Sequence, residues 1–157
     1  MKSLLLVVGK TNENWLSEAV NEYKNRISRY IQFEMTVIPD MKNRGKIETE
    51  KLKKQEGECI LKSINDADII CLLDEQGKQY SSEGFSNWIN NNFMITSKRI
   101  VFIIGGAYGF SDSVYKRANY LISLSPMTFS HQMVRLIFTE QLYRAFTIIK
   151  NEPYHHA

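Results

Sequence analysis

Short apolar runs along the chain have the character of buried parallel strands. Continuous runs of this length are typical of strands that are covered on both faces of a sheet. They occupy residues 4–8, 67–73, 99–104 and 120–124. A further strand is expected at 33–38, where apolar and polar residues alternate until Pro39 ends the segment. The pattern therefore predicts a sheet of five strands.

Between these strands the apolar residues recur at helical spacing. In the first such segment, residues 12–30, Asn12 is the expected N-cap and the expected buried stripe is Trp15, Ala19, Tyr23 and Ile27. Further helices are expected at 48–65, after Ser81 or Ser82, after Ser111 or Asp112, and at 132–150. Strands that alternate with helices predict an α/β fold around a mostly parallel sheet, and the length of 157 residues predicts one domain over 1–157.

The last predicted helix has two different sides. A broad apolar arc is expected to pack on the sheet, and it consists of Val134, Ile137, Phe138, Leu142, Ala145, Ile148 and Ile149. The opposite side alternates charged residues (Arg135, Glu140 and Arg144) with large apolar ones, namely Leu136, Tyr143 and Phe146. Because a side that faces only solvent would not need large apolar residues, we expect it to form an interface or the wall of a site.

Charge permits a nucleic-acid partner without requiring one. The formal net charge is only +3, whereas strong electrostatic binders of nucleic acid concentrate far more positive charge. The polar segment 40–54 is read either as a solvated loop and helix face or as a flap that faces RNA. Its basic residues are Lys42, Arg44, Lys46, Lys51, Lys53 and Lys54.

The cysteines and the apolar runs bear on the compartment. Cys59 and Cys71 have no metal-ligand spacing, and Cys71 in its apolar run is expected in the core. Two lone thiols favour a reducing compartment. The apolar run at the start is short for a secretory signal, and no segment approaches the roughly 20 apolar residues of a membrane span. We therefore expect a cytoplasmic protein, without a metal and without a membrane partner.

The candidate chemistry lies at three predicted strand ends, since ligands of open α/β sheets bind beyond the carboxyl ends of the strands. Leu73 leads into an expected turn at 74–78. The strand at 99–104 leads into Gly105 and Gly106, which permit close approach of a ligand to the backbone. That segment is neither GxGxxG nor a P-loop, so a tight turn and a ligand site are equally good interpretations.

The third strand end leads into a non-helical stretch at 125–130. Its backbone groups are suited to reading the edge of an adenine, and Met127 and Phe129 are suited to forming apolar walls. The alternative is an ordinary loop between a strand and a helix.

Long segments of the chain resemble a known family. They are IIGGAYGFSDSV, SLSPMTFSHQMVRLIFTEQLYRAF and the terminal NEPYHH, and together with LLLVVGK near the start they cover nearly the whole chain. In these segments the chain resembles the ribosomal RNA large subunit methyltransferase H family of the SPOUT superfamily. The resemblance implies a Rossmann-like sheet with a C-terminal deep trefoil knot, a rare feature that periodicity does not indicate.

The resemblance also implies a cofactor and partners. The cofactor is S-adenosylmethionine (SAM), and the positions that match the family's binding residues are Leu73, Gly105, Gly106, Ser125, Pro126, Met127, Thr128, Phe129 and Ser130. The implied assembly is a homodimer, with Leu136, Tyr143 and Phe146 as candidate apolar contacts. The implied substrate is ribosomal RNA in the large subunit or the 70S ribosome, methylated at N3 of a pseudouridine in the helix 69 loop of 23S RNA.

Four residues are candidates for the chemistry. The N3 proton must leave, so a general base has to reach it. His131 titrates near neutrality, or it is simply a loop histidine bonded to the backbone. Tyr154 and His155 lie in a tail that resembles a substrate-side element, where Tyr154 is suited to stacking on an unpaired base. Arg144 either pairs with Glu140 along the helix or orients the RNA.

Three further points complete the expectations. Asp74 and Glu75 are either solvated or in contact with the ribose or the amino group of the cofactor. The chain ends in His156 and Ala157, where family members often carry Lys or Arg after the histidine. The competing hypotheses are a non-catalytic RNA-binding dimer that assists ribosome assembly and another small nucleotide-binding α/β enzyme.

Overall fold

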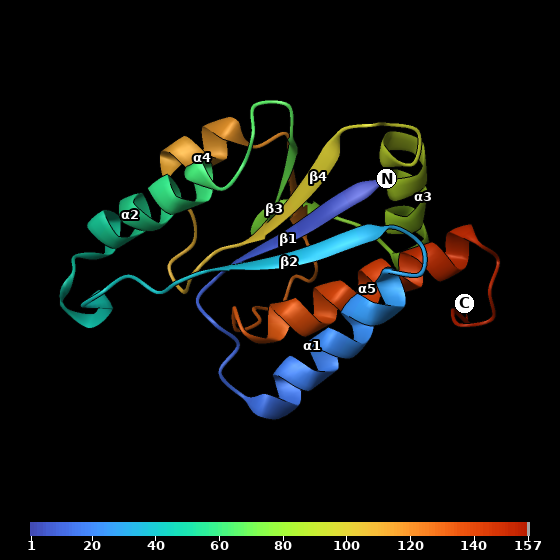
Figure 1. Ribbon diagram of the computed structural model, residues 1–157, viewed down its shortest axis with the longest axis horizontal. Helices are drawn as coiled ribbons and strands as arrows, with labels where there is room; N and C mark the ends of the chain where they lie inside the picture. Colours follow the sequence, from blue (N-terminus) through green and yellow to red (C-terminus); the bar gives the residue numbers. More distant parts are fainter. Residues whose placement is uncertain (157) are drawn as a thin grey trace.

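The apolar runs form a parallel sheet whose strand order is β2-β1-β4-β3-β5 (Figure 1). The computed structural model describes residues 1–156, so the ending at Ala157 lies outside the described residues. The strands are β1 (Lys2–Val8), β2 (Gln32–Ile38), β3 (Ile69–Gln79), β4 (Arg99–Ile104) and β5 (Tyr120–Ser123). The helices are α1 (Asn14–Ile27), the short 3-10 helix η1 (Arg44–Lys46), α2 (Thr49–Lys62), α3 (Ser82–Phe93), α4 (Asp112–Arg117) and α5 (Met133–Ile149). The α/β prediction is confirmed.

Helices cover both faces of the sheet, as continuous apolar strands require. Successive side chains of a strand point to opposite faces, so Leu5 and Val7 of β1 join one core while Leu4 and Leu6 join the other. The first core is closed by α1, α3 and α5, and the second by α2 and α4. Figure 1 shows α1 and α5 on one side of the strands and α2 and α4 on the other.

The buried side of α1 differs from the predicted stripe. The helix begins at Asn14, and Glu13 rather than Asn12 occupies the N-cap position. Its buried residues are Leu16, Val20 and Ile27, whereas Trp15 is 56% exposed. Residues spaced strictly by four drift about 40° per step around a helix of 3.6 residues per turn. A stripe with that spacing cannot stay on one face along the whole helix. Its last member, Ile27, is buried, and its first member, Trp15, lies outside the buried face.

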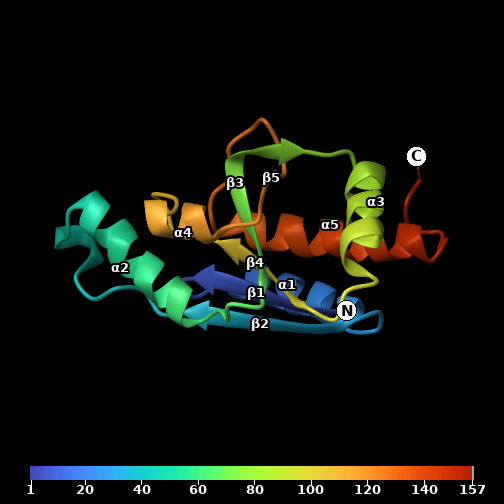
Figure 2. The ribbon, with the colours of Figure 1, turned by 90° about the horizontal axis from the view of Figure 1, so that it is seen from above.

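The predicted turn at 74–78 is wrong. β3 continues to Gln79, and its register against β5 slips so that Leu73 and Lys78 both lie opposite Ile122. The four residues between them bulge out of the ladder, and Figure 2 shows the strand bending sharply. A Cβ at Gly77 would lie 2.5 Å from backbone atoms of Ile122, so only glycine permits this approach. The strand continues beyond the bulge because Lys78 and Gln79 again pair with β5.

The predicted arc of α5 is partly wrong. Phe138, Leu142 and Ala145 are buried as expected, but Arg135 and Phe146, which were predicted on the mixed side, are 0% exposed. α5 packs against both α1 and α3, so its buried side is wider than a single apolar arc. Phe146 stacks on Tyr30 with ring centroids 5.6 Å apart. It is therefore unavailable as a contact to a second protomer, whereas Leu136 and Tyr143 are half-buried.

The remaining expectations concern smaller features. Ser81 caps α3 by accepting a hydrogen bond from the backbone N–H of Gly84 at 3.0 Å, as one of the two predicted caps. Ser111 occupies the N-cap position of α4 without a side-chain capping bond. Cys71 is buried in the core as predicted. In residues 1–156 no helix combines the length and the apolar character that crossing a membrane requires.

Candidate active site

A pocket of about 800 Å³ lies beside the bulge of β3 and beyond the carboxyl ends of β4 and β5. Its size is in the range of small-molecule sites. The predicted ligand-binding residues that line it are Leu73, Gly105, Gly106, Ser125, Met127, Thr128, Phe129 and Ser130. Pro126 is the one member of the predicted set that is not among the lining residues. The three strand ends named from the sequence thus converge on one cavity.

The glycine segment after β4 is both a tight turn and a wall of the pocket. Gly109 has a φ of +81° and donates its backbone N–H to the carbonyl of Gly106 at 3.2 Å. A Cβ at Gly105 would lie 3.0 Å from the ring of Phe110. A Cβ at Gly106 would lie 2.8 and 3.0 Å from the carboxylate oxygens of Glu56 on α2. A side chain at either glycine would therefore have to displace Phe110 or the carboxylate of Glu56, and its absence also leaves the backbone open to the cavity.

The loop between β5 and α5 forms the opposite wall. The hydroxyl of Ser125 accepts a hydrogen bond from the backbone N–H of Met127 at 2.9 Å. The hydroxyl of Ser130 accepts one from the backbone N–H of Met133 at 3.2 Å, at the start of α5. Met127 is 74% exposed and Phe129 is 36% exposed. The loop therefore has a defined shape and presents apolar side chains at the mouth of the pocket.

Charged groups line the pocket near the bulge of β3. Asp74, Glu75 and Lys53 all contribute to its lining. The hydroxyl of Tyr115 donates a hydrogen bond to Oδ2 of Asp74 at 2.5 Å. Burial, and then this bond, raise the pKa of Tyr115, so its phenol stays protonated. Asp74 is thus held in place as an acceptor at the edge of the cavity.

His131 is the one candidate for the chemistry that lines this pocket. Burial lowers the pKa of its imidazole, and the positive charges of Arg135 and Arg44 lower it further. A lowered pKa leaves the ring neutral at pH 7, which is the form that accepts a proton. The backbone carbonyl of His131 accepts a hydrogen bond from Nε of Arg135 at 3.3 Å, and this main-chain bond does not involve the imidazole, so the alternative of a side chain bonded to the backbone stays untested.

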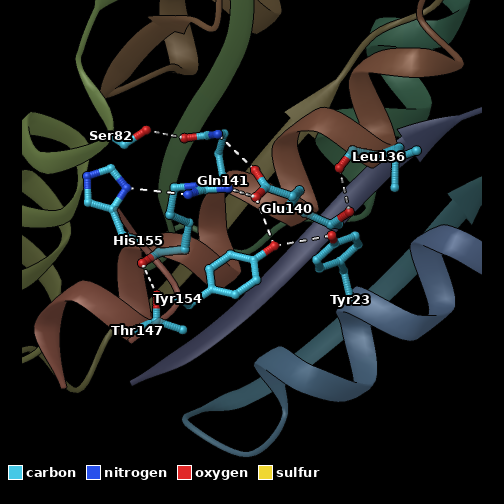
Figure 3. Close-up of polar contacts among 10 residues, drawn as sticks. Tyr23, Ser82, Leu136, Glu140, Gln141, Thr147, Tyr154 and His155 are labelled. Atoms are coloured by element: carbon cyan, nitrogen blue, oxygen red, sulfur yellow. Dashed lines mark hydrogen bonds and ion pairs between the residues drawn. The ribbon is translucent and has the colours of Figure 1, made fainter. Parts of the chain in front are cut away.

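Tyr154 and His155 (Figure 3) form a separate polar cluster with Arg144 near the C-terminal end of α5. Arg144 forms an ion pair with Glu140, and Tyr154 donates to Oε1 of the same carboxylate at 3.1 Å. Thirteen residues separate Arg144 from His131, which is about 20 Å along a helix axis. Within one protomer the structure therefore does not bring this cluster to the pocket.

The polar groups of the cluster are engaged with one another. Arginine only donates, so the 3.3 Å contact between Nη1 of Arg144 and Nδ1 of His155 makes Nδ1 the acceptor. Burial, and then the bond to Tyr23, raise the pKa of Tyr154. The guanidinium of Arg144 lies 4.8 Å from the centroid of the Tyr154 ring and covers one of its faces. In the isolated protomer, the ring of Tyr154 and the Nδ1 lone pair of His155 are thus both engaged.

The predicted RNA-facing flap presents a smaller charge than its composition indicates. Arg44 donates to Asp40 at 2.7 Å, and Lys53 donates to Glu50 at 3.3 Å. Lys42, Lys46, Lys51 and Lys54 are exposed without such a bond in the described part of the chain. Over the same residues, no group of three or more His, Cys, Asp or Glu side chains could hold a metal ion.

Sequence reasoning missed several residues of the pocket region. Besides several apolar lining residues, they include Lys53 and Tyr115, which line the pocket, and Glu56, which lies behind Gly106. Tyr115 bonds a residue 41 positions away, and Glu56 faces a glycine 50 positions away along the sequence. Local patterns carry no signal for such pairs.

Comparisons with known proteins agree along the whole chain. The family model described as predicted SPOUT methyltransferase matches residues 1–155. A protein of Parabacteroides distasonis named ribosomal RNA large subunit methyltransferase H is 54% identical over 156 residues, 99% of each chain. A protein of Christiangramia forsetii with the same name is 54% identical over 152 residues, 97% of each chain.

Solved structures show the same fold at low sequence identity. A Legionella pneumophila protein, Lpg2936, whose structure contains the bound cofactor SAM, aligns with a TM-score of 0.51 at 15% identity. The alignment covers 92% of this chain and 66% of that one. At this identity the likeness concerns the fold alone.

Proposed function

The chain belongs to the SPOUT methyltransferase family, and on that premise we propose that it methylates ribosomal RNA of the large subunit with SAM as its cofactor. The observation that carries the proposal is the pocket at the bulge of β3 and the ends of β4 and β5, where Leu73, the glycine turn and the loop 125–130 meet. The relatives at about half identity, matched from end to end, are named for this activity.

The residues of the pocket fit the chemistry of SAM. The glycine turn exposes backbone groups to the ligand, and the loop 125–130 offers further backbone groups beside Met127 and Phe129 for an adenine ring. Asp74 and Glu75 supply carboxylates that can accept hydrogen bonds from ribose hydroxyls or from an ammonium group. SAM supplies an activated methyl group, so the protein mainly has to align the nucleophile with it.

The target is N3 of a pseudouridine in the helix 69 loop of 23S RNA, presented by the assembled ribosome or large subunit. His131 lies at the pocket with a neutral imidazole, so it accepts the N3 proton. A small protein with a net charge of +3 makes few contacts to phosphates, and these supply little affinity for naked RNA. A structured target, which offers further contacts, is therefore favoured. The exposed lysines of the flap, Lys42, Lys46, Lys51 and Lys54, contribute the salt-sensitive part of binding. Action on ribosomes implies the cytoplasm.

The working unit is a homodimer. The cluster of Arg144, Tyr154 and His155 lies too far from the pocket of its own protomer to act there, so it completes the pocket of the other protomer. Leu136 and Tyr143 remain candidate contacts, and Met127 and Phe129 add exposed apolar surface at the mouth of the pocket. In this arrangement His155 and Arg144 approach the RNA side of the methyl group.

The whole chain acts as one domain, and its C-terminal part forms the trefoil knot of the superfamily. The segment after β5 supports this topology. β5 lies at the edge of the sheet, yet Gln132 and Arg135 reach the connection after β1, on the far side of β3 and β4. The chain must therefore pass the ends of both strands within the loop 124–132.

Methyl transfer to ribosomes tests the proposal. Ribosomes from a strain that lacks the modification are incubated with the purified protein and tritiated SAM, and the RNA is digested and separated. We expect label in one pseudouridine of the large-subunit RNA, and none with ribosomes that already carry the mark. Ribosome association without label and without affinity for SAM would support a non-catalytic assembly factor and overturn the proposal.

A further inference from the structure

The pocket loop 125–131 is tied to the connection between β1 and α1. The side-chain amide of Gln132, which directly follows the loop, makes two hydrogen bonds to this connection. Its Oε1 accepts a hydrogen bond from the backbone N–H of Asn12 at 3.0 Å, and its Nε2 donates to the carbonyl of Lys10 at 3.1 Å. These contacts join positions 120 and 122 residues apart in the sequence.

Arg135 forms a second tie one turn further along α5. Its guanidinium donates to the carbonyl of Val8 at 2.8 Å, to Oγ1 of Thr11 at 3.0 Å and to the carbonyl of His131 at 3.3 Å. The side chain is 0% exposed, and it forms no ion pair with any of residues 1–156. A buried guanidinium without a carboxylate is unfavourable unless its donors are well satisfied. Its planar donors therefore fix the carbonyls of β1 and the loop in one relative position.

The loop has few other restraints on its position. The bonds made by Ser125 and Ser130 are local, so they shape the loop without anchoring it to the sheet. Residues 126–130 are exposed. Among residues 1–156, the long-range hydrogen bonds near this loop are those of Gln132, just before α5, and of Arg135, in the first turn of α5, so they determine where the wall of the pocket lies.

We infer that Gln132 and Arg135 are positioning residues that hold the loop 125–131 in its ligand-binding conformation. The β1–α1 connection, which does not line the pocket, thereby contributes to cofactor affinity. A loop that is already ordered loses less conformational entropy when a ligand binds, so loosening the ties weakens binding without removing any ligand contact. The inference rests on the proposed cofactor site and names two residues that act on it indirectly.

The test compares Gln132→Ala with the wild type and with Gln141→Ala. Gln141 is a matched control, since it is a half-buried glutamine of the same helix, hydrogen-bonded to Ser82 and Glu140 and not to the loop. SAM affinity is measured by calorimetry, and backbone hydrogen exchange is measured without cofactor. For Gln132→Ala we expect the Kd for SAM to rise by roughly tenfold, which corresponds to about 1.4 kcal/mol. Exchange of the backbone amides within 126–131 (Pro126 has none) becomes faster, while Gln141→Ala leaves both quantities unchanged.

Steady-state kinetics separates positioning from a general loss of stability. The KM for SAM rises in Gln132→Ala while kcat at saturating SAM stays near the wild-type value. If this variant does not fold, Thr11→Val carries the test, because it is isosteric and removes only the acceptor for Arg135. An unchanged Kd and unchanged exchange at 126–131 in a folded variant overturn the inference. A wild type that binds no SAM instead overturns the proposed function, whatever the exchange data show.

Discussion

Gly106→Ala perturbs the contact between the glycine turn and α2. The new methyl carbon would lie 2.8 Å from Oε2 and 3.0 Å from Oε1 of Glu56. Glu56 is 4% exposed, so its carboxylate has little room to withdraw. Either the side chain of Glu56 moves against α2 or the turn moves into the pocket.

The size of the effect follows from this overlap. Adding a methyl group to a well-packed interior costs about 1–3 kcal/mol. If the turn moves into the pocket and cofactor binding must reverse that movement, the same free energy appears as a rise of roughly 5- to 150-fold in the Kd for SAM. Gly106→Val adds two more carbons and is expected to abolish binding while the fold survives.

A double-mutant cycle identifies the origin of the strain. Glu56→Ala removes the colliding carboxylate, so adding it to Gly106→Ala is expected to restore most of the lost stability. The coupling between the two substitutions is then about 1–2 kcal/mol, as for residues in direct contact. Urea unfolding gives the stabilities, and calorimetry gives the Kd for SAM.

The cycle also has a clear contrary result. If Gly106→Ala binds SAM like the wild type and unfolds at the same urea concentration, the turn neither collides with Glu56 nor forms a wall of the cofactor site. If Gly106→Ala lowers stability but shows no coupling to Glu56→Ala, the collision with Glu56 is refuted, whereas the place of the turn in the wall of the cofactor site is not.

Three further predictions address the tail, a buried carboxyl and the dimer surface. Truncation after Pro153 spares SAM binding but lowers methyl transfer by about 100-fold, the cost of a misplaced reacting group; normal turnover in the ribosome assay removes the tail from the mechanism. Burial raises the pKa of Glu56 above 4.5. The folded state therefore binds the proton more tightly, and stability falls as the pH rises through 4.5 to the folded pKa. Urea titrations should show that Glu56→Gln lacks this loss, and parallel pH profiles would contradict the assignment. Phe146→Ala lowers stability by about 3–5 kcal/mol, because it empties a fully buried site, whereas Phe146→Leu leaves the dimerisation constant in sedimentation unchanged; a weakened dimer would return Phe146 to the interface.

Most of the sheet could be predicted because its strands are buried on both faces. Such strands appear as continuous apolar runs, and β1 and β4 were found almost to the residue. The extension of β3 past Asp74 could not be found this way. Its polar residues suit a turn, and only the pairing of Lys78 and Gln79 with β5 makes them a strand.

The pocket could be predicted from general rules, but its supporting contacts could not. Parallel strand ends meet at one edge, so Leu73, the glycine turn and the loop 125–130 were expected together. Burial of Arg135 follows from carbonyl and hydroxyl acceptors more than 120 residues away, which leave no local signature. The separation between the pocket and the cluster around Arg144 likewise could not be predicted, because it depends on α5 being one continuous helix that holds the two apart.

A titration of isotope-labelled protein with SAM, followed by NMR, tests the central claim most directly, since it reports where the ligand sits without presupposing any reaction. We expect saturable shift changes centred on Leu73, Gly105, Gly106 and residues 125–130, with smaller changes at Gln132. Shifts confined to the surface around Ser82 and Gln141, or no shifts at millimolar SAM, would contradict a cofactor site at the bulge of β3 and the ends of β4 and β5.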